Sequence, residues 1–430
     1  MNMPPRSPVF IDVFAGCGGL SLGLMQSGWK GLFAVEHDAN AFQTLGHNLL
    51  EERAKHRYDW PLWLPKTPIS VFDLLTNYSE KIAGLAGSVD MLVGGPPCQG
   101  FSSAGKRNPQ DPRNRLVDAY LEVVSILKPR IVLIENVRGI TSDFMEGPET
   151  RVNYAQRIIE KLDQDYHVAT QLIDVSMFGV PQRRHRFFII AARRGCGFED
   201  FSPFENLELN RQRFLSDKGI AVAPVTAKMA ISDLEVARNG KAVSRDTKGF
   251  EEITYSSPIT SYQRLMRMGT LSGIEDTRLA NHRADIKIRF AKFIELCHSE
   301  GRLNKSLSAE LKASFGLKKS AIRVLDPDQP SPTITSMPDD LIHYSEPRTL
   351  TVRENARLQS FPDFFEFKGK YTSGGERRKH EVPRFTQVAN AVPPLIAEAI
   401  GRMLASTLVD IRSTSQTIRE QSHESLVFQP

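Results

Sequence analysis

Short apolar runs alternate with amphipathic stretches through the first half of the chain. Continuously apolar runs predict strands buried on both faces, and amphipathic stretches predict helices that cover them. The expected strands are residues 9–14, 31–35, 91–93, 131–134 and 187–191. The expected helices are residues 20–27, 39–50, 115–127 and 154–164. Strands and helices in alternation are typical of βαβ units, so we expect an α/β fold with a parallel, doubly wound sheet.

The alternation ends at about residue 194, where polar and charged residues begin to dominate. A helix is expected at residues 352–360, and another at residues 395–403, where a preceding Pro-Pro pair suits a helix N-terminus. The end of the chain is rich in Ser, Thr, Gln and Glu and is expected to fray. The expected segments are a first domain (1–193), a second, smaller domain (194–382), a helix that returns to the first domain (383–405) and a tail (406–430).

The composition is that of a folded protein, because 40% of the 430 residues are hydrophobic and 24% are charged, which excludes a disordered or collagen-like chain. The four cysteines, Cys17, Cys98, Cys196 and Cys297, form no CxxC pair, so we expect neither a metal site nor a disulfide framework. The N-terminus has no apolar signal core, and no apolar run approaches the roughly 18 residues that a membrane span needs. We therefore expect a cytoplasmic protein without membrane contact.

The net charge of +5 is unevenly distributed along the chain. Residues 1–193 carry 21 basic and 20 acidic side chains, residues 194–382 carry 30 and 26, and residues 383–430 carry four of each. Most of the positive excess therefore lies in the expected second domain. A bias of this size fits a polyanionic partner but also arises without one, so it gives nucleic-acid binding only modest support.

A glycine-rich turn, FIDVFAGCGGLSLG at residues 10–23, joins the first expected strand to the first expected helix. Glycines let a ligand approach the backbone closely, and the helix N-terminus offers free N–H donors. A dinucleotide-binding fingerprint would need glycine where Ser21 stands, which argues against a nicotinamide cofactor. Glu36 follows the next expected strand, where a carboxylate can accept hydrogen bonds from both hydroxyls of a ribose. When the turn is considered alone, a purely structural turn that binds no ligand is about as good an interpretation as a ligand-binding one.

Two further expected strands end in reactive or charged side chains. The sequence GGPPCQGFS at residues 94–102 places the Cys98 thiol on a loop stiffened by two prolines, and Glu135 directly follows the apolar run 131–134. Because ligands of α/β folds bind beyond the carboxyl ends of the strands, we expect both side chains at the same edge as the glycine-rich turn. Taken singly, Cys98 would more often be a small buried hydrophobe, and Glu135 a capping or ion-paired residue.

The sequence VPQRRHRFFII at residues 180–190 leads into the last of the expected strands. Because strand side chains alternate, Gln182, Arg184 and Arg186 share one face, while Arg183 and His185 take the other. Two guanidinium groups on one face can bind an oxyanion, a phosphate or a base oxygen. A solvated edge strand is an alternative of about equal weight, and His185 is expected to have an ordinary surface or packing role.

Taken together and in this order, these segments resemble the cytosine-C5 DNA methyltransferase family of the bacterial restriction-modification type. The resemblance also includes residues 323–336 and QVANAVPP at residues 387–394, and it spans about residues 10–401. A Pro-Pro-Cys-Gln loop, then Glu-Asn-Val at a strand end, then Gln-x-Arg-x-Arg is highly specific for that family. The resemblance implies the Rossmann-like, doubly wound sheet of an S-adenosylmethionine-dependent methyltransferase, with a smaller target-recognition domain.

In the chemistry of this family, a methyl group moves from S-adenosylmethionine to carbon 5 of a cytosine that is flipped out of duplex DNA. The resemblance implies that the Cys98 thiolate adds to C6 of the ring and that Glu135 hydrogen-bonds or protonates N3. Arg184 and Arg186 would bind the ring oxygen and help to hold the catalytic loop, and Arg184 or the cofactor's sulfonium would lower the pKa of the thiol. The base that removes the C5 proton is not identified.

The same resemblance implies a set of cofactor contacts. For one of them, Asp73, the match to the family pattern is weaker, because a loop about twenty residues longer than in that pattern precedes it. The implied contacts are Phe14 at the adenine, Gly16, Cys17, Gly18, Gly19 and Leu20 at the methionine part, Glu36 at the ribose, Asp73 at the adenine amino group, and Pro97, Leu116 and Asn390 elsewhere in the pocket. The family commonly has glycine where this chain has Ala389. If that position needs a positive φ, alanine there would cost roughly 1 kcal/mol.

Double-stranded DNA is the partner that the resemblance implies, read by the second domain, and a cognate restriction endonuclease is a candidate functional partner. A monomer is expected from the resemblance alone. Three alternatives stay open: the same chemistry on tRNA, a non-catalytic DNA-binding relative, and an NAD-dependent oxidoreductase. The presence of both Cys98 and Glu135 disfavours the second, and Ser21 disfavours the third. The recognition sequence cannot be predicted.

Overall fold

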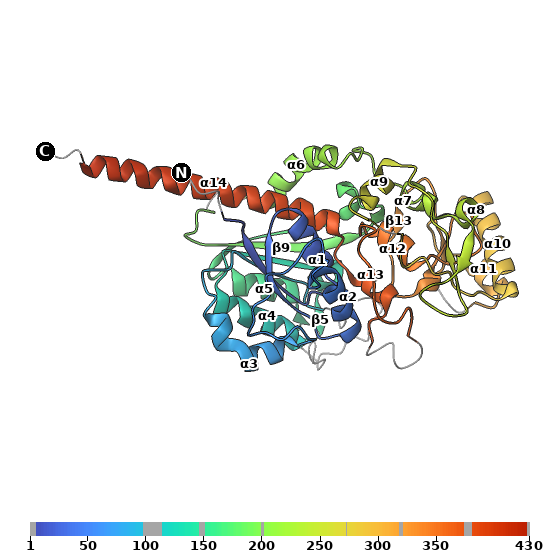
Figure 1. The fold of residues 1–430 in the computed structure, drawn as a ribbon, viewed down its shortest axis with the longest axis horizontal. Helices are drawn as coiled ribbons and strands as arrows, with labels where there is room; N and C mark the ends of the chain where they lie inside the picture. Colours follow the sequence, from blue (N-terminus) through green and yellow to red (C-terminus); the bar gives the residue numbers. More distant parts are fainter. Residues whose placement is uncertain are drawn as a thin grey trace.

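The structure, a computed structural model, consists of two lobes and a long C-terminal helix (Figure 1). It describes residues 6–97, 114–145, 151–198, 202–271, 273–317, 321–373 and 381–427. Cys98 lies outside the described residues. The first lobe contains a central sheet, and the second is built of short helices and strands around an irregular backbone.

Six strands form the central sheet, and five of them run in the same direction. Their order is β2 (Lys30–Val35), β1 (Val9–Val13), β3 (Met91–Gly94), β4 (Ile131–Val137), β9 (His185–Arg193) and β7 (Tyr166–Asp174). The expectation of an all-parallel sheet is wrong at β9, which is antiparallel to both β4 and β7. Only residues 175–184 join β7 to β9, which is too short for a parallel crossover, and parallel neighbours need a dozen or more residues between them.

Helices cover both faces of the sheet, as a doubly wound fold requires. In β3, Met91 and Val93 face one apolar cluster and Leu92 faces the other, because successive strand side chains point to opposite faces. The first cluster is completed by α1 (Gly19–Gln26), α2 (Ala39–Leu49), α6 (Pro203–Asp217) and α14 (Pro394–Val427). The second is completed by α3 (Val71–Ala83), α4 (Asn114–Leu127) and α5 (Tyr154–Leu162). The expected helices and strands of the first half are confirmed, whereas α3 and β7 were not predicted.

The C-terminal helix α14 packs closely on α1. A Cβ atom at Gly23 would lie 2.4 Å from the carbonyl oxygen of Pro394, so only glycine permits this approach. The indole N–H of Trp29 donates to the carbonyl of Gly401 at 2.8 Å, which fixes the helix on the sheet lobe. The predicted start of this helix after Pro-Pro is confirmed. The helix α14 continues to Val427, and its sequence contains no Gly or Pro beyond Gly401. The expected fraying after residue 405 stays a prediction.

By length and composition, one stretch among the described residues could cross a membrane: Arg384–Ile411, which joins α13 (Arg384–Asn390) to the start of α14. Its most apolar window is 72% buried inside the protein, as is usual for the core helix of a globular fold.

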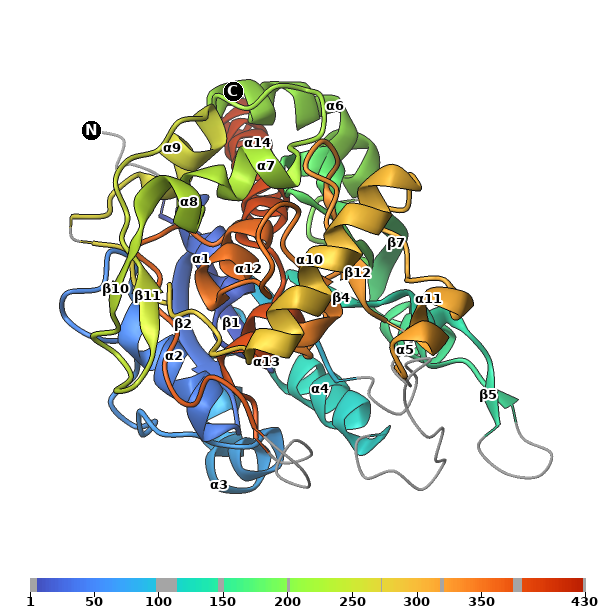
Figure 2. The same ribbon diagram turned by 90° about the vertical axis from the view of Figure 1, so that its right-hand side faces the viewer.

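The second lobe surrounds α12 (Val352–Leu358) and α13, as Figure 2 shows from that side. Its other elements are α7 (Ala227–Ile231), α8 (Val236–Asn239), α9 (Ser261–Arg267), α10 (Ala284–Ser299), α11 (Ala309–Ser314), β10 (Lys241–Val243), β11 (Glu251–Ile253), β12 (Arg323–Val324), β13 (Ser331–Pro332) and β14 (Leu341–Ile342). Two short pairings lie elsewhere: β5 (Phe144–Met145) with β6 (Arg151–Val152), and β8 (Gln182–Arg183) with β13. The helix predicted at residues 352–360 is confirmed as α12. The main core runs on into this lobe through α7, α9 and α12, so the boundaries at 194 and 382 stay a prediction.

Candidate catalytic and cofactor site

The carboxyl ends of β1, β3 and β4 meet at one edge of the sheet, where the sequence predicted the site. In the register, Gly94 pairs with both Val13 and Ile134, so the segments that follow these residues are neighbours. The amide of Asn136 donates to the carbonyl of Pro96 at 2.9 Å. A Cβ at Gly95 would lie 3.3 Å from the Glu135 carboxylate, so the Gly-Gly-Pro-Pro loop rests directly on Glu135.

Glu135 forms an ion pair with Arg186. The Nε atom of Arg186 lies 2.8 Å from Oε1 of Glu135, and each side chain is only 10% exposed. Arg186 also donates from Nη1 to the carbonyl of His185 at 2.8 Å. A buried carboxylate is tolerated when it is paired in this way, and the pair leaves carboxylate and guanidinium together at the strand end that supports the loop before Cys98.

The predicted alternation along residues 182–186 is confirmed. Gln182, Arg184 and Arg186 are buried on one face, whereas Arg183 and His185 are exposed on the other. Arg184, however, turns toward α13 and donates from Nη2 to the carbonyl of Ala389 at 2.7 Å. Burial, together with the neighbouring charge of Arg186, lowers the pKa of the Arg184 guanidinium. Of the two arginines, only Arg186 is paired with the candidate catalytic carboxylate.

The glycine-rich turn has the backbone that its sequence predicts. Gly16 and Gly18 have φ angles of 56° and 96°, and Phe14 also adopts a positive φ of 68°. Among the described residues, no atom lies within 4 Å of a Cβ built on Gly16, so a ligand can approach the backbone there. The Glu36 carboxylate accepts hydrogen bonds from the N–H groups of Gly16 at 2.9 Å and Asp38 at 2.7 Å. These two bonds orient Glu36 beside the turn and leave further lone pairs for a ligand.

Other residues in and beside the turn also have packing contacts. The Cys17 thiol is buried and donates weakly to the carbonyl of Gln387 at 3.7 Å, and burial raises its pKa to about 12, which disfavours the nucleophilic thiolate form. A Cβ at Gly19 would lie 2.4 Å from the carbonyl of Val392, and Leu20 is buried in the core. The ring of Phe14 stacks on Tyr120, with centroids 6.4 Å apart.

The remaining implied cofactor residues lie on separate helices. Asp73 is exposed in the first turn of α3, where its carboxylate accepts the Ser70 hydroxyl at 2.6 Å in a capping box. The N–H of Ile69 donates to the carbonyl of Glu36 at 2.8 Å, which holds this helix start near the end of β2. Leu116 is half-buried on α4, Pro97 ends the described part of its loop, and Asn390 is the exposed last residue of α13.

The backbone at Ala389 differs from what a glycine-requiring position would show. Ala389 lies inside α13 and is not among the described residues with positive φ. Alanine therefore carries no conformational penalty there, because the strain expected for an L-residue applies only at positive φ.

A buried hydrogen-bond chain beneath the turn escaped prediction. The Ser21 hydroxyl donates to the Asp12 carboxylate and lies 2.5 Å from the hydroxyl of Tyr58. Asp12 is 1% exposed, and burial raises its pKa to about 7. The sequence did contain a signal for this chain of hydrogen bonds. Asp12 interrupts an apolar strand, and Ser21 stands where a dinucleotide-binding fingerprint would need glycine. Only the fold brings Tyr58 to this pair.

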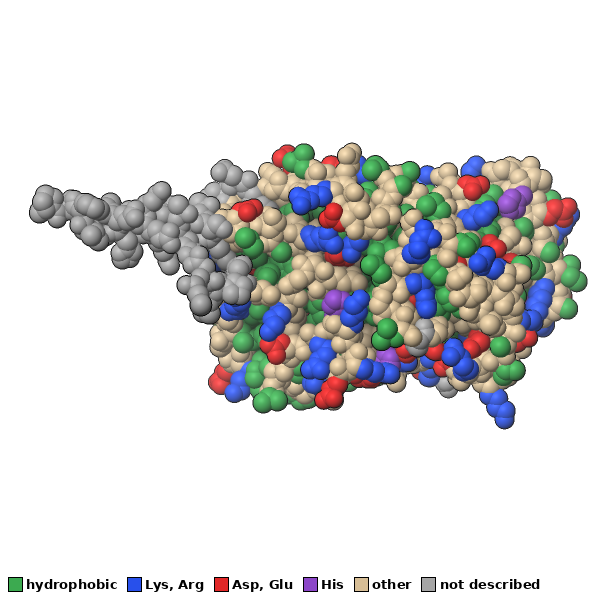
Figure 3. All heavy atoms as spheres, turned by 45° about the horizontal axis from the view of Figure 1, so that its top comes forward, with side chains coloured by type: hydrophobic (Ala, Val, Ile, Leu, Met, Phe, Trp, Pro, Cys, Tyr) green, Lys and Arg blue, Asp and Glu red, His purple; other side chains and the backbone are tan. Residues whose placement is uncertain are grey.

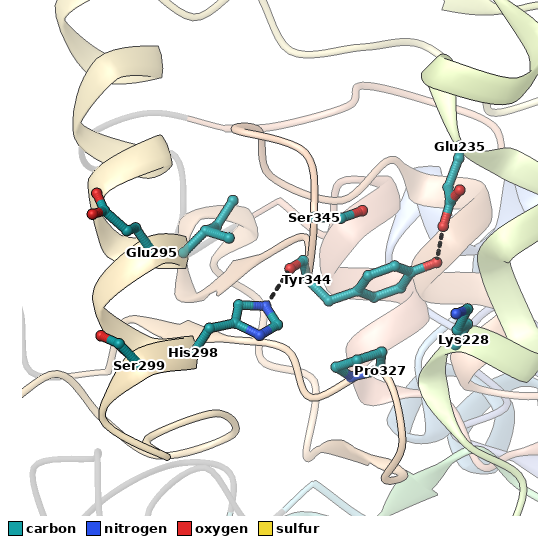
Figure 4. Close-up of a pocket in the computed structure, with 9 residues that line it drawn as sticks. Lys228, Glu235, Glu295, His298, Ser299, Pro327, Tyr344 and Ser345 are labelled. Atoms are coloured by element: carbon teal, nitrogen blue, oxygen red, sulfur yellow. Dashed lines mark hydrogen bonds between the residues drawn. The ribbon is translucent and has the colours of Figure 1, made fainter.

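The second lobe contains an open cleft of about 910 Å³, lined mainly by α10 and the segment after β14, with Lys228 of α7 and Glu235 at its side. Figure 4 shows the Tyr344 hydroxyl pointing at Glu235, to which it donates at 2.5 Å, and His298 hydrogen-bonded to the Tyr344 carbonyl. None of the residues that line this cleft belongs to the predicted catalytic or cofactor set.

The surface charge is mixed. Figure 3 shows Lys and Arg side chains scattered over one face of the molecule and interspersed with Asp and Glu. The positive excess counted for residues 194–382 is therefore not gathered into a single patch on this face.

The doubly wound sheet and the polar groups at its carboxyl edge define an α/β enzyme with a Rossmann-like methyltransferase fold. The profile of the C-5 cytosine-specific DNA methylase family matches residues 9–406. The chain therefore belongs to the C-5 cytosine-specific DNA methylase family and is a DNA cytosine-5-methyltransferase.

Similar proteins cover nearly the whole chain. Type II methyltransferase M.DdeI of Desulfomicrobium norvegicum is 31% identical, over 92% of this chain and 88% of its own. Type II methyltransferase M.AgeI of Thalassovita gelatinovora is 32% identical, over 93% of this chain and 98% of its own. The crystal structure of a putative DNA modification methyltransferase encoded within an E. coli prophage is 25% identical, with a TM-score of 0.63 over 94% of this chain and 100% of that one. The S. pombe Dnmt2 methyltransferase shares the fold at 13% identity, with a TM-score of 0.50 over 94% of this chain and 99% of that one.

Proposed function

We propose that this protein transfers the methyl group of S-adenosylmethionine to carbon 5 of a cytosine flipped out of duplex DNA, with Cys98 as the nucleophile. The observation that carries the proposal is the Glu135–Arg186 pair, held against the loop that leads to Cys98 and is described as far as Pro97. A carboxylate and a guanidinium fixed together can address a ring nitrogen and the adjacent ring oxygen of one base.

The residues at the glycine-rich turn fit the proposed methyl donor. The space above Gly16 admits a ligand, the oriented Glu36 carboxylate can accept ribose hydroxyls, and the Phe14 ring offers a face for the adenine. Asp73, Leu116, Pro97 and Asn390 would complete the pocket. When bound, S-adenosylmethionine supplies an electrophilic methyl group on a sulfonium.

In the proposed reaction, the Cys98 thiolate forms a bond to C6 of the cytosine, and the electron pair of the C5–C6 double bond becomes available at C5. Glu135 hydrogen-bonds N3 and stabilises the charge that develops on the ring. Arg186 orients Glu135 and can contact the ring oxygen, whereas Arg184 supports the site through α13. After C5 is methylated, loss of the C5 proton to a base and of the Cys98 thiolate from C6 restores the aromatic ring.

We also propose that the second lobe reads the target sequence in duplex DNA, that the protein acts as a monomer in the cytoplasm, and that it protects DNA beside a cognate restriction endonuclease. The curated relatives named above are Type II methyltransferases, which supports DNA as the substrate over tRNA.

Expression in a host that lacks cytosine methylation, followed by bisulfite sequencing of its DNA, tests this function. We expect cytosines at one recurring short sequence to be protected from conversion, and the same cells carrying Cys98→Ser to show complete conversion. Complete conversion in cells that make soluble wild-type protein, with methylated cytosine in their tRNA, would overturn the DNA assignment.

A further inference from the structure

The short helix α13 contacts the second lobe at its first residue and the candidate site toward its last. At the start of the helix, Nη1 of Arg384 lies 2.8 Å from Oδ2 of Asp246 and 3.0 Å from Oδ1 of Asp276, two carboxylates of the second lobe. The Arg384 guanidinium also lies over the ring of Tyr371, 4.2 Å from its centroid, and the Tyr371 hydroxyl donates to Asp246 at 2.5 Å.

Asp276 is held in an unusual conformation by these contacts. It has a φ of 66°, which non-glycine residues rarely adopt, and it is 4% exposed. Its carboxylate accepts from Arg384, from Arg353 at 3.3 Å and from the N–H of Phe367 at 2.9 Å. A strained backbone persists only where its surroundings determine it fully, and such residues concentrate at functional sites.

The later residues of α13 hold the candidate site. The carbonyl of Gln387 accepts the Cys17 thiol of the glycine-rich turn, and its side-chain oxygen accepts the Thr44 hydroxyl of α2 at 2.6 Å. The carbonyl of Ala389 accepts Arg184, two residues before the Arg186 that pairs with Glu135. One rigid helix therefore joins carboxylates of the second lobe to the turn proposed to hold the methyl donor.

We propose that Arg384 is a positioning residue through which the second lobe sets the affinity for the methyl donor. By bridging Asp246 and Asp276, Arg384 seats α13 so that Gln387 and Ala389 keep the glycine-rich turn and Arg184 in place. This inference rests on the proposed function, because it assigns the turn to S-adenosylmethionine.

If the ion pairs of Arg384 served only folding, their loss would change kcat and KM differently. Loss of a buried ion pair that serves only folding lowers the fraction of active protein, and so lowers kcat without changing KM. Loss of a positioning contact loosens the turn in protein that remains folded, and so raises KM for the methyl donor. Coupling between two sites of this kind commonly changes affinity 5- to 150-fold.

The experiment compares Arg384→Met, which keeps most of the aliphatic stem, with Arg384→Lys, which keeps the charge. A control in the same lobe is Arg245→Met, because Arg245 also bridges two acidic residues, Glu252 at 2.7 Å and Glu275 at 3.3 Å, without a bond to α13, although its side chain is 61% exposed against 11% for Arg384. Methyl transfer from tritiated S-adenosylmethionine is measured at saturating plasmid DNA from a host that lacks cytosine methylation. For Arg384→Met we expect KM for the methyl donor to rise about tenfold with kcat within about threefold of wild type.

A second measurement needs no methyl donor. In the free protein, hydrogen exchange of backbone amides in residues 14–24 should be at least about fivefold faster in Arg384→Met, while amides of α10 exchange at the wild-type rate. Arg384→Lys should recover part of both effects, and Arg245→Met should show neither. Asp246→Asn should raise KM in the same direction, and the double variant with Arg384→Met should add nothing further, because both remove the same bridge.

An unchanged KM and unchanged exchange at residues 14–24 in Arg384→Met would overturn the inference, as would equal effects of Arg245→Met. Failure of the proposed function is recognised separately. In that case the wild-type protein itself transfers no methyl group to DNA, while the exchange comparison still decides whether α13 controls the turn.

Discussion

The two lobes of this molecule are stabilised by different means. The sheet lobe buries alternating apolar residues on both faces of regular strands, and its buried charges include the Glu135–Arg186 pair at the edge where the site lies. The second lobe has little regular structure, and the middle of its fold is a buried ionic network. In that network Arg357, fully buried, donates to both Asp363 at 2.5 Å and Asp233 at 3.2 Å.

Buried charges therefore have different roles in the two lobes: at the candidate site of the sheet lobe they are available for chemistry, and in the second lobe they stabilise the fold. Buried charges are costly unless they are paired, so a lobe with much irregular backbone can use them to fix one arrangement of its loops. In the sheet lobe the regular backbone fixes the arrangement, and the charged pair Glu135–Arg186 at the sheet edge is available for reaction. We therefore expect substitutions of the reactive residues at the sheet edge to lower turnover, and substitutions within the buried ionic network of the second lobe to lower stability.

The largest effect is expected at the loop beside Glu135. Cys98→Ser should lower methyl transfer at least about 10³-fold, because serine is a far weaker nucleophile toward C6, while the dissociation constant of S-adenosylhomocysteine stays within a few-fold of wild type. Calorimetry and a tritium-transfer assay measure the two quantities. Cys196→Ser, which changes a half-buried thiol outside the site, is the control and should keep full turnover. Loss of cofactor binding in Cys98→Ser would show that this loop serves the cofactor and not the base.

The second lobe should respond in stability. Arg357→Met leaves the carboxylates of Asp233 and Asp363 buried without their guanidinium, which should lower the free energy of unfolding by about 3–5 kcal/mol. Urea unfolding measures this. The matched control is Arg157→Met, which removes an exposed ion pair with Asp118 and should cost less than about 1 kcal/mol. Equal effects of the two substitutions would contradict the contrast between the lobes.

The sequence predicts the two lobes to very different extents. The strands and helices of the first half follow from apolar periodicity, and the edge that gathers Gly16, Glu36 and Glu135 follows from their positions at strand ends. The reversed direction of strand β9 could not be predicted. It depends on the short connection from β7, and β7 itself was not predicted because it carries exposed polar residues. In the second lobe, the pairing of Arg357 with Asp233 depends on side chains 124 residues apart, which no local pattern records.

The sequence predicted which face of the strand Arg184 and Arg186 share, but it did not predict the partner of each side chain. The alternation that buries both Arg184 and Arg186 was predicted from strand geometry, but their separate partners, Ala389 and Glu135, depend on how α13 docks against the sheet. Local sequence contains no information about that docking.

A smaller effect tests Asp12, a buried carboxyl group of the sheet lobe whose pKa is raised. Burial raises the pKa of Asp12 from 3.8 to about 7, so the folded protein binds a proton that the unfolded chain releases. This contribution to stability is therefore full below pH 4 and is lost as pH rises toward 7. Between pH 5 and 7.5 the wild type should lose about 2 kcal/mol more than Asp12→Asn, whose side chain does not titrate. Urea unfolding at the two pH values measures the difference, and parallel pH profiles would contradict a protonated Asp12.

The smallest effect is expected where the two lobes meet, at Ala389. Ala389→Gly introduces the residue that the family commonly has, yet the backbone here is helical and the side chain is 5% exposed. Glycine in a helix interior is less favourable than alanine by about 1 kcal/mol, and the loss of a buried methyl group adds to this. We expect urea unfolding to show a loss of about 1–2 kcal/mol with kcat little changed, since Arg184 bonds the carbonyl and not the side chain. A gain in stability would contradict this expectation. It would mean that residue 389 prefers a positive φ and that α13 ends before this residue in solution.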